Sequence, residues 1–96
     1  MNPYNNSVSG MIKFLLGETK FIKFKATYPE HPEFNITSAR YEVFHNGEKI
    51  EEGAMDVDEH ELSMRYSPSA RGFFDLYVEL VVSDTTRRKH FRIDVD

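Results

Sequence analysis

The chain has 96 residues, no cysteine and a formal net charge of −4, from 12 basic and 16 acidic side chains. This length provides one domain and excludes multidomain enzymes, and the lack of cysteine excludes disulfides, thiolate nucleophiles, iron–sulfur clusters and cysteine zinc sites. The acidic balance argues against a nucleic-acid partner. With 40% hydrophobic and 14% aromatic residues, the chain can nonetheless bury a core and fold alone.

The N-terminal segment is rich in Asn and Ser and ends at Gly10. It predicts a flexible arm over residues 1–10, followed by one domain over residues 11–96. The arm has neither the basic start nor the apolar stretch of a signal peptide, and the chain has no apolar run long enough to span a membrane. We therefore expect cytoplasmic synthesis and no membrane partner. An extracellular location is expected if the chain is a fragment of a longer secreted protein.

The first predicted strands occupy residues 11–16 and 20–28. In the second, Ile22 and Phe24 alternate with Lys23 and Lys25, which is typical of a strand with one buried face. Two prolines within residues 29–32 then interrupt the chain, because proline lacks the backbone donor that a central strand needs.

The next two strands, at residues 36–45 and 48–55, flank Asn46-Gly47. This dipeptide tolerates positive φ at both positions, so it predicts a tight hairpin turn. The second strand of the hairpin carries several glutamates and Gly53, which suits a charged edge that discourages pairing with other chains.

An acidic, turn-like segment at residues 56–61 precedes a strand at 62–66, a corner at 67–72 and a long strand at 73–83. The long strand is the most apolar and is expected to be central. A turn at 84–86 leads to a last strand at 87–96. Seven strands at this spacing predict an all-β, Greek-key β-sandwich of antiparallel sheets, with a small barrel as the alternative.

The segments at residues 17–29, 41–48 and 66–80 resemble immunoglobulin-like domains of the bacterial and bacteriophage type. The first has Gly-Glu-Thr before an alternating strand and a proline, and the last has Pro, small residues, Gly and two Phe before a strand. The resemblance covers about residues 11–96. The chain departs from antibody domains because it has no Cys and no Trp, and Tyr41 stands where the third strand often carries Trp.

Such domains occur in surface adhesins, as appendages on phage capsids and tails, and beside carbohydrate-active enzymes. Since phage structural proteins are assembled inside the host without export, the resemblance together with the missing signal peptide implies a virion protein. The alternatives are a carbohydrate-binding accessory module, with Phe73 and Tyr77 as stacking platforms, and a fragment of a bacterial adhesin.

The sequence carries little that favours catalysis. It has no nucleophile-elbow pattern and no phosphate-binding glycine pattern, and we assign no catalytic or cofactor-binding residue. Its four histidines are spread over separate turns and strand ends, so we interpret them as solvated surface groups and not as metal ligands. The acidic residues at 56–61 leave a calcium site open, although a solvated loop is the better interpretation.

The outward face of the third and sixth predicted strands is the strongest candidate site. The two strands are neighbours in an immunoglobulin-like sheet, so Phe44, Phe73 and Tyr77 would project together beside Arg40. A contiguous aromatic patch with a charged rim is typical of a protein contact. We therefore expect this face to bind a protein partner or a second copy of the chain. The alternative is that the N-terminal arm or the loop at Pro29 covers these rings within the monomer. The basic cluster at residues 87–89 is interpreted as a solvated turn or a charged strand edge.

Overall fold

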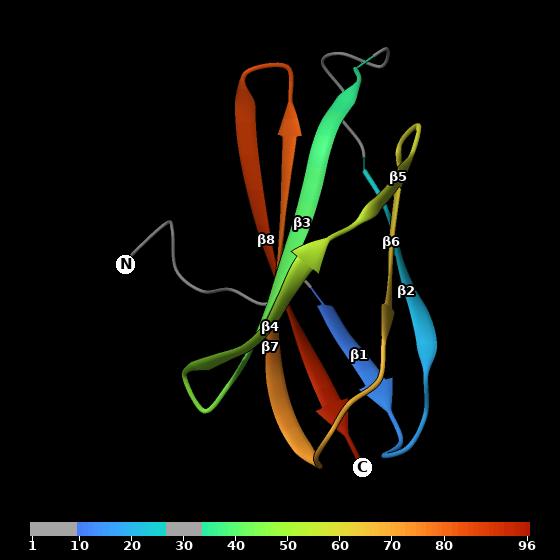
Figure 1. Ribbon diagram of the computed structural model, residues 1–96, viewed down its shortest axis with the longest axis vertical. Helices are drawn as coiled ribbons and strands as arrows, with labels where there is room; N and C mark the ends of the chain where they lie inside the picture. The colour runs from blue at the N-terminus through green and yellow to red at the C-terminus, as the bar shows by residue number, and fades with distance from the viewer. Residues whose placement is uncertain (1–9, 27–33) are drawn as a thin grey trace.

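The structure, a computed structural model, describes residues 10–26 and 34–96. In chain order its strands are β1 (Gly10–Phe14), β2 (Lys20–Lys25), β3 (Ile36–His45), β4 (Glu48–Ala54), β5 (Asp56–Asp58), β6 (Glu61–Tyr66), β7 (Gly72–Val82) and β8 (Thr85–Val95). Five strands form one sheet in the order β1-β8-β7-β3-β4, and three form the other in the order β2-β6-β5. The sheets face each other as two layers (Figure 1). No helix occurs in the described residues, and so they contain no helix that is long and apolar enough to span a membrane.

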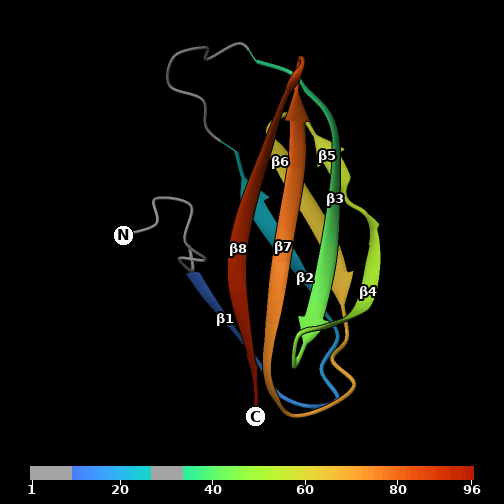
Figure 2. The ribbon, with the colours of Figure 1, turned by 90° about the vertical axis from the view of Figure 1, so that its left-hand side faces the viewer.

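The strand order is that of an immunoglobulin-like sandwich. The neighbours β3, β7 and β8 correspond to the C, F and G strands of one sheet, and β2, β6 and β5 to the B, E and D strands of the other. The prediction of an all-β sandwich is thereby confirmed, and β7 is central as expected. Figure 2 looks onto the outer face of the five-stranded sheet, with β2 and β6 behind it.

Two details of the predicted fold are wrong. There are eight strands, because the acidic segment interpreted as a turn contains β5, which pairs antiparallel with β6 around a turn where Glu59 has φ 55°. The backbone hydrogen bonds to β6 outweigh the poor strand propensity of Asp. The sheets are also not wholly antiparallel, since β1 runs parallel to β8. The chain leaves β1 for the other sheet, so β1 cannot form a hairpin with its own neighbour in sequence.

The hairpin turns account for the strand ends. Asn46 and Gly47 have φ 53° and 80°, which confirms the tight turn predicted between β3 and β4. At the other end of the sheet, the turn between β7 and β8 is formed by Ser83 (φ 56°) and Asp84, and β8 begins at Thr85. The predicted turn at residues 84–86 is therefore misplaced, and the basic cluster at 87–89 lies within β8.

The core lies between the sheets and follows the predicted alternation. Phe74, Leu76, Val78 and Leu80 of β7 are all buried, and so are Ile22, Leu62, Met64 and Tyr66 of the facing sheet. Phe24, Tyr41 and Phe91 are partly buried and pack against this cluster. Burial at every second residue is what two pleated sheets with one dry face each require.

Some predicted features fall outside the described residues. Of the predicted arm at residues 1–10, only Gly10 is described, and it begins β1. The predicted continuation of the second strand through Thr27 and Tyr28, and the two prolines at 29–32, also lie outside. At the far edge of the larger sheet, β4 carries Glu48, Glu51 and Glu52, all exposed, which confirms the charged edge.

Candidate functional site

The candidate residues lie on the outer face of the five-stranded sheet, as predicted. Strands β3 and β7 pair antiparallel, with Arg40 opposite Glu79, Glu42 opposite Tyr77, and Phe44 opposite Asp75. Because side chains alternate between faces, Arg40 and Phe44 share the outer face with Phe73 and Tyr77.

Two of the predicted aromatic residues form a packed row and not an open patch. The rings of Phe44 and Tyr77 meet edge to face, with centroids 5.5 Å apart. Tyr77 also stacks on His90 of β8 at 4.5 Å, and the guanidinium of Arg88 lies 4.5 Å from the centre of the Tyr77 ring. These contacts cover much of both rings and leave them half-buried. Phe44 and Tyr77 therefore lie on the outer face as the alternation predicts, with their rings partly covered by neighbours in the same sheet.

The histidines are also more involved than expected. His90 is buried, and its Nε2 lies 2.7 Å from Oδ1 of Asp75 on β7. His45 stacks on Phe74 at 4.2 Å, and His60 stacks on Phe34 at 4.1 Å. The interpretation of these three as solvated surface groups is wrong, because each has a ring partner and is at most partly exposed. His31 lies outside the described residues.

Charged side chains surround the aromatic row, and Glu42 is their centre. Its carboxylate accepts hydrogen bonds from Arg88 (3.1 Å) and from Lys49 (3.3 Å). Burial alone would raise the pKa of Glu42, but the hydrogen bonds and charges of these two cations outweigh it and hold that pKa below its ordinary value. Arg40 lies at the rim and donates a hydrogen bond of 2.5 Å to Glu52.

The exposed part of this face lies around Phe73, at the end of the sheet where β7 begins. Phe73 has 57% of its surface exposed, and Arg92 of β8 lies 5.8 Å from the centre of its ring. On β1, Met11 pairs with Arg92 and is 53% exposed. Met11, Phe73 and Arg92 are called the Phe73 patch below. Asp75 and the ion pair between Lys13 and Asp94 (2.8 Å) adjoin it.

Sequence reasoning found Phe73 but missed Met11 and Arg92. Alternation from Phe91 and Ile93 places Arg92 on the outer face, and this signal was present in the sequence. Met11 joins the patch only because β1 pairs in parallel with β8, which alternation within β1 alone cannot indicate.

The acidic segment has no metal-binding geometry among the described residues, where no group of three His, Asp or Glu side chains is arranged to hold an ion. Its outer face carries Asp56 and Asp58 on β5, which are exposed. The calcium site that the sequence left open therefore gains no support from this arrangement.

Comparison with known proteins identifies the fold. No protein-family model matches the chain, and no curated protein matches it. An engineered protein solved by the Northeast Structural Genomics Consortium is similar with a TM-score of 0.70, at 9% identity over 96% of this chain. A candidate glycoside hydrolase from Bacteroides vulgatus ATCC 8482 is similar with a TM-score of 0.54, at 14% identity over 88% of this chain. At such identities the likeness shows the fold alone.

The chain spans only part of these two proteins, 19% of the first and 16% of the second. The extracellular domain of mouse leukocyte-associated immunoglobulin-like receptor 1, crystallised as a strand-swapped dimer, overlaps with a TM-score of 0.46. Its identity is 14%, over 100% of this chain and 95% of the receptor domain. That overlap is too loose to carry an argument. The topology and the two closer likenesses define an all-β sandwich with immunoglobulin-like strand order.

Proposed function

We propose that this domain is a non-enzymatic interaction module that binds a protein partner through the Phe73 patch. The observation that carries the proposal is the exposure of Phe73 and Met11, at 57% and 53%, on either side of Arg92. Burying apolar surface of this kind stabilises a complex by about 25 cal/mol per Å² before the costs of association. Its non-enzymatic character is supported by the absence of nucleophile and phosphate-loop patterns in the sequence.

The composition of the patch supports a protein as the partner. Aromatic residues, Met and Arg are enriched in protein–protein interfaces, and binding energy concentrates in a few such residues surrounded by polar groups. The Lys13–Asp94 ion pair and Asp75 provide that polar surround. Phe44 and Tyr77 would support the patch from the neighbouring row, and Arg40 would lie at the rim of a larger contact.

We propose further that the partner is a subunit of a phage or prophage particle, or a second copy of this chain. The support is the likeness of residues 17–29, 41–48 and 66–80 to immunoglobulin-like domains of bacteria and their phages, some of which decorate capsids and tails. An exposed apolar patch rimmed by polar residues is typical of a face through which a domain contacts another protein.

The proposal can be tested by photocrosslinking. A benzoylphenylalanine residue at position 73 is compared with the same residue at position 21, because Phe21 is similarly exposed (59%) but lies on β2, in the other sheet. In cells of the source organism, we expect position 73 to give one protein adduct that excess wild-type domain competes away, and position 21 to give none. Equal adducts at both positions, or no competed adduct at position 73, would contradict a specific interface.

The carbohydrate-binding alternative retains one supporting observation, which is the exposed ring of Phe73. Tyr77 is less suited to stacking on a sugar, since it already contacts Phe44, His90 and Arg88. Titration with cell-wall and plant polysaccharides separates the two functions. Binding by the monomer that is lost in Phe73→Ser would favour the sugar, and no binding would favour the protein partner.

A further inference from the structure

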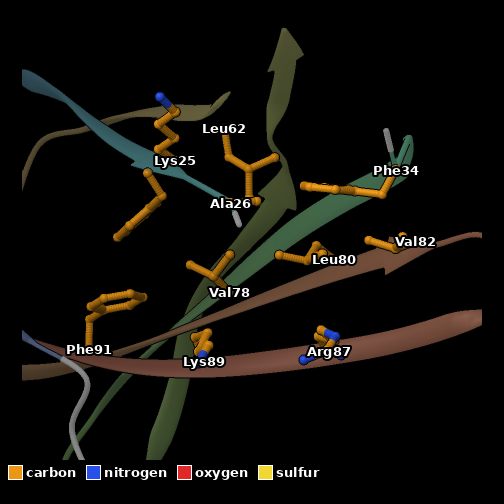
Figure 3. A pocket seen from close by; sticks show the side chains of 11 residues that line it. Lys25, Ala26, Phe34, Leu62, Val78, Leu80, Val82, Arg87, Lys89 and Phe91 are labelled. Atoms are coloured by element: carbon orange, nitrogen blue, oxygen red, sulfur yellow. The ribbon is translucent and has the colours of Figure 1, made fainter. Parts of the chain in front are cut away.

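Each sheet ends in two strands whose outer edge pairs with no strand in the described part of the chain. These are β1 and β4 in the larger sheet and β2 and β5 in the smaller. An open strand edge can pair with another chain, and proteins commonly prevent this with charged side chains. Three of the four edges carry exposed charges of one predominant sign. They are Glu48, Glu51 and Glu52 on β4, Asp56 and Asp58 on β5, and Lys20, Lys23 and Lys25 on β2. Figure 3 shows Lys25 pointing away from the cavity between the sheets. Each of these edges therefore repels a copy of itself.

Strand β1 is the exception among these edges. Its one charged residue is Lys13, which is already paired with Asp94 of the neighbouring strand β8 at 2.8 Å. The other exposed side chain of β1 is Met11, which is apolar. Within the described residues, β1 is therefore the sheet edge with the least charge to oppose the pairing of another strand.

The hydrogen bonds of β1 show which of its backbone groups face this edge. The carbonyl of Phe14 accepts a hydrogen bond of 3.0 Å from the backbone N–H of Asp96, so Phe14 directs its backbone groups toward β8. Alternation then directs those of Met11 and Lys13 away from β8, toward the free edge. In agreement, the carbonyl of Lys13 accepts a hydrogen bond of 2.7 Å from Nζ of Lys20, which belongs to the other sheet. That bond uses one of the two lone pairs of the carbonyl and leaves the other for a strand.

Two copies of β1 fit each other when they run antiparallel about a two-fold axis at Ile12. Met11 of each copy then lies opposite Lys13 of the other, and both residues direct their backbone groups across the contact, as a hydrogen-bonded pair requires. On the outer face each lysine lies opposite a methionine and not opposite a second lysine, so like charges do not meet directly. Because each copy offers the same edge to the other, the contact closes at two copies.

The core-facing side of this edge also has apolar surface to bury. A groove of about 330 Å³ lies between β1 and β2, and Ile12, Ile22, Phe24 and Phe91 contribute apolar side chains to its lining. In the two-fold pairing, Ile12 of the second copy lies opposite Ile12 on this same side of the sheet. Its side chain would cover part of the groove, and the loss of apolar surface from water would add to the backbone hydrogen bonds.

We propose that the chain forms a two-fold dimer through antiparallel pairing of β1, which joins two five-stranded sheets into one of ten strands. The dimer does not depend on the proposed function, because β8 separates β1 from β7 and leaves Phe73 open. It would present two Phe73 patches on one continuous face, and a partner with two matching sites would gain avidity. Since the strand contact is short, we expect a weak dimer with a Kd of about 10–100 µM.

Analytical ultracentrifugation of the purified chain over a range of concentrations tests the dimer. We expect a reversible monomer–dimer equilibrium, and a monomer at every concentration up to about 500 µM would overturn the proposal. Phe73→Ser is the control on the same face and should dimerise like the wild type. Loss of the dimer in Phe73→Ser would show association through the Phe73 patch, which overturns pairing of β1 and leaves the proposed function in place. A dimer without an adduct from position 73 would contradict the proposed function alone.

A pair of charged substitutions at Met11 tests the register. Met11→Glu places a carboxylate opposite Lys13 of the second copy, and Met11→Lys places an ammonium group there. Because each dimer contains this pair twice, Met11→Glu should dimerise at least about fivefold more tightly than Met11→Lys. A general effect of the net charge of −4 would give the opposite order, since glutamate adds to that charge and lysine reduces it. The opposite order, or equal affinities, would overturn the proposal.

A single cysteine locates the two-fold axis, because the chain has no cysteine of its own. In Ile12→Cys the two thiols would lie in a non-hydrogen-bonded pair, with Cα atoms about 4.5 Å apart and within reach of a disulfide. Met11→Cys is the matched control, since Met11 lies opposite Lys13 and not opposite itself. Under mild oxidation we expect a covalent dimer from Ile12→Cys and none from Met11→Cys. No covalent dimer from a folded Ile12→Cys, or equal yields from both variants, would overturn the proposal. If Ile12→Cys fails to fold, the charged pair at Met11 decides the register.

Discussion

The ring of Tyr41 on β3 lies directly over Gly53 on β4, with which it pairs across the sheet. A methyl group added at Gly53 would stand 3.1 Å from both Cε1 and Oη of Tyr41. The ring cannot move aside freely, because its hydroxyl donates a hydrogen bond of 2.8 Å to Glu51. Gly53 therefore accommodates the aromatic ring that replaces the usual tryptophan of the third strand.

Substitution of Gly53 tests this contact, because its effect on the free energy of unfolding should change sign when the Tyr41 ring is removed. Gly53→Ala should destabilise the domain by about 1–2 kcal/mol, because the added methyl group crowds a fixed ring. In a Tyr41→Ala background the same substitution should stabilise by about 0.5–1 kcal/mol, since alanine loses less backbone entropy on folding than glycine. Urea denaturation of the four chains gives both values. Destabilisation in both backgrounds would show that the ring is not the obstacle.

The buried Tyr66 and the partly buried Tyr41 should make the domain sensitive to alkali. Burial, and for Tyr41 also its hydrogen bond to Glu51, raises the pKa of Tyr41 and that of Tyr66 to about 12. Their ordinary pKa is about 10, so the neutral phenols contribute stability that is fully present below about pH 10 and is lost as the pH rises toward 12.

This loss is measured as the urea midpoint from about pH 8 to about pH 12, beside tyrosinate absorbance at 295 nm. The variants Tyr41→Phe and Tyr66→Phe should each show a shallower decline. Ionisation of both tyrosines near pH 10 in the folded domain would contradict the expectation.

Acid should destabilise the domain in part through Glu42. The pKa of this carboxyl is held below its ordinary value in the folded state, so its contribution is present above that ordinary value and is lost as the pH falls through the lowered pKa. Glu42→Gln should therefore reduce the dependence of stability on pH below about 4. Glu59→Gln, in the β5–β6 turn, is the control and should leave the acid limb unchanged. Identical acid limbs for Glu42→Gln and the wild type would exclude this contribution.

The His90–Asp75 contact should contribute to stability. His90→Ala removes a hydrogen bond of 2.7 Å and the stack on Tyr77, and it should cost about 1–3 kcal/mol. His90→Phe keeps a ring against Tyr77 and should cost less than the alanine variant. Urea denaturation at neutral pH measures both. Equal losses in the two variants would show that stacking contributes little.

Much of the fold could be predicted from alternation alone. The inward residues of β7 and the turn at Asn46-Gly47 follow from local chemistry, because two-residue periodicity and positive φ are properties of short segments. The parallel pairing of β1 and the short strand β5 could not be predicted in this way. Both depend on which distant strand supplies the hydrogen bonds, and that is decided by the whole sandwich.

The candidate site could likewise be predicted only in part from the sequence. Alternation placed Phe44, Phe73 and Tyr77 on one face, and pairing of β3 with β7 brought them together. It could not indicate that Arg88 and His90 would cover Tyr77 while Phe73 stayed open, since exposure depends on side chains of the neighbouring strand. The same limit explains why the three described histidines were assigned to solvent.

The acidic strand β4 ends the larger sheet with three carboxylates and one ammonium group, and a free strand edge is a template for further strands. When the β4 edges of two molecules approach each other as neighbouring strands, their carboxylates come close together and repel. Protonation below about pH 4 would remove that repulsion, so the domain should form ordered fibrils in acid more readily than at neutral pH. Resistance of the domain to fibril formation at neutral pH should therefore depend on the carboxylates of this single edge strand.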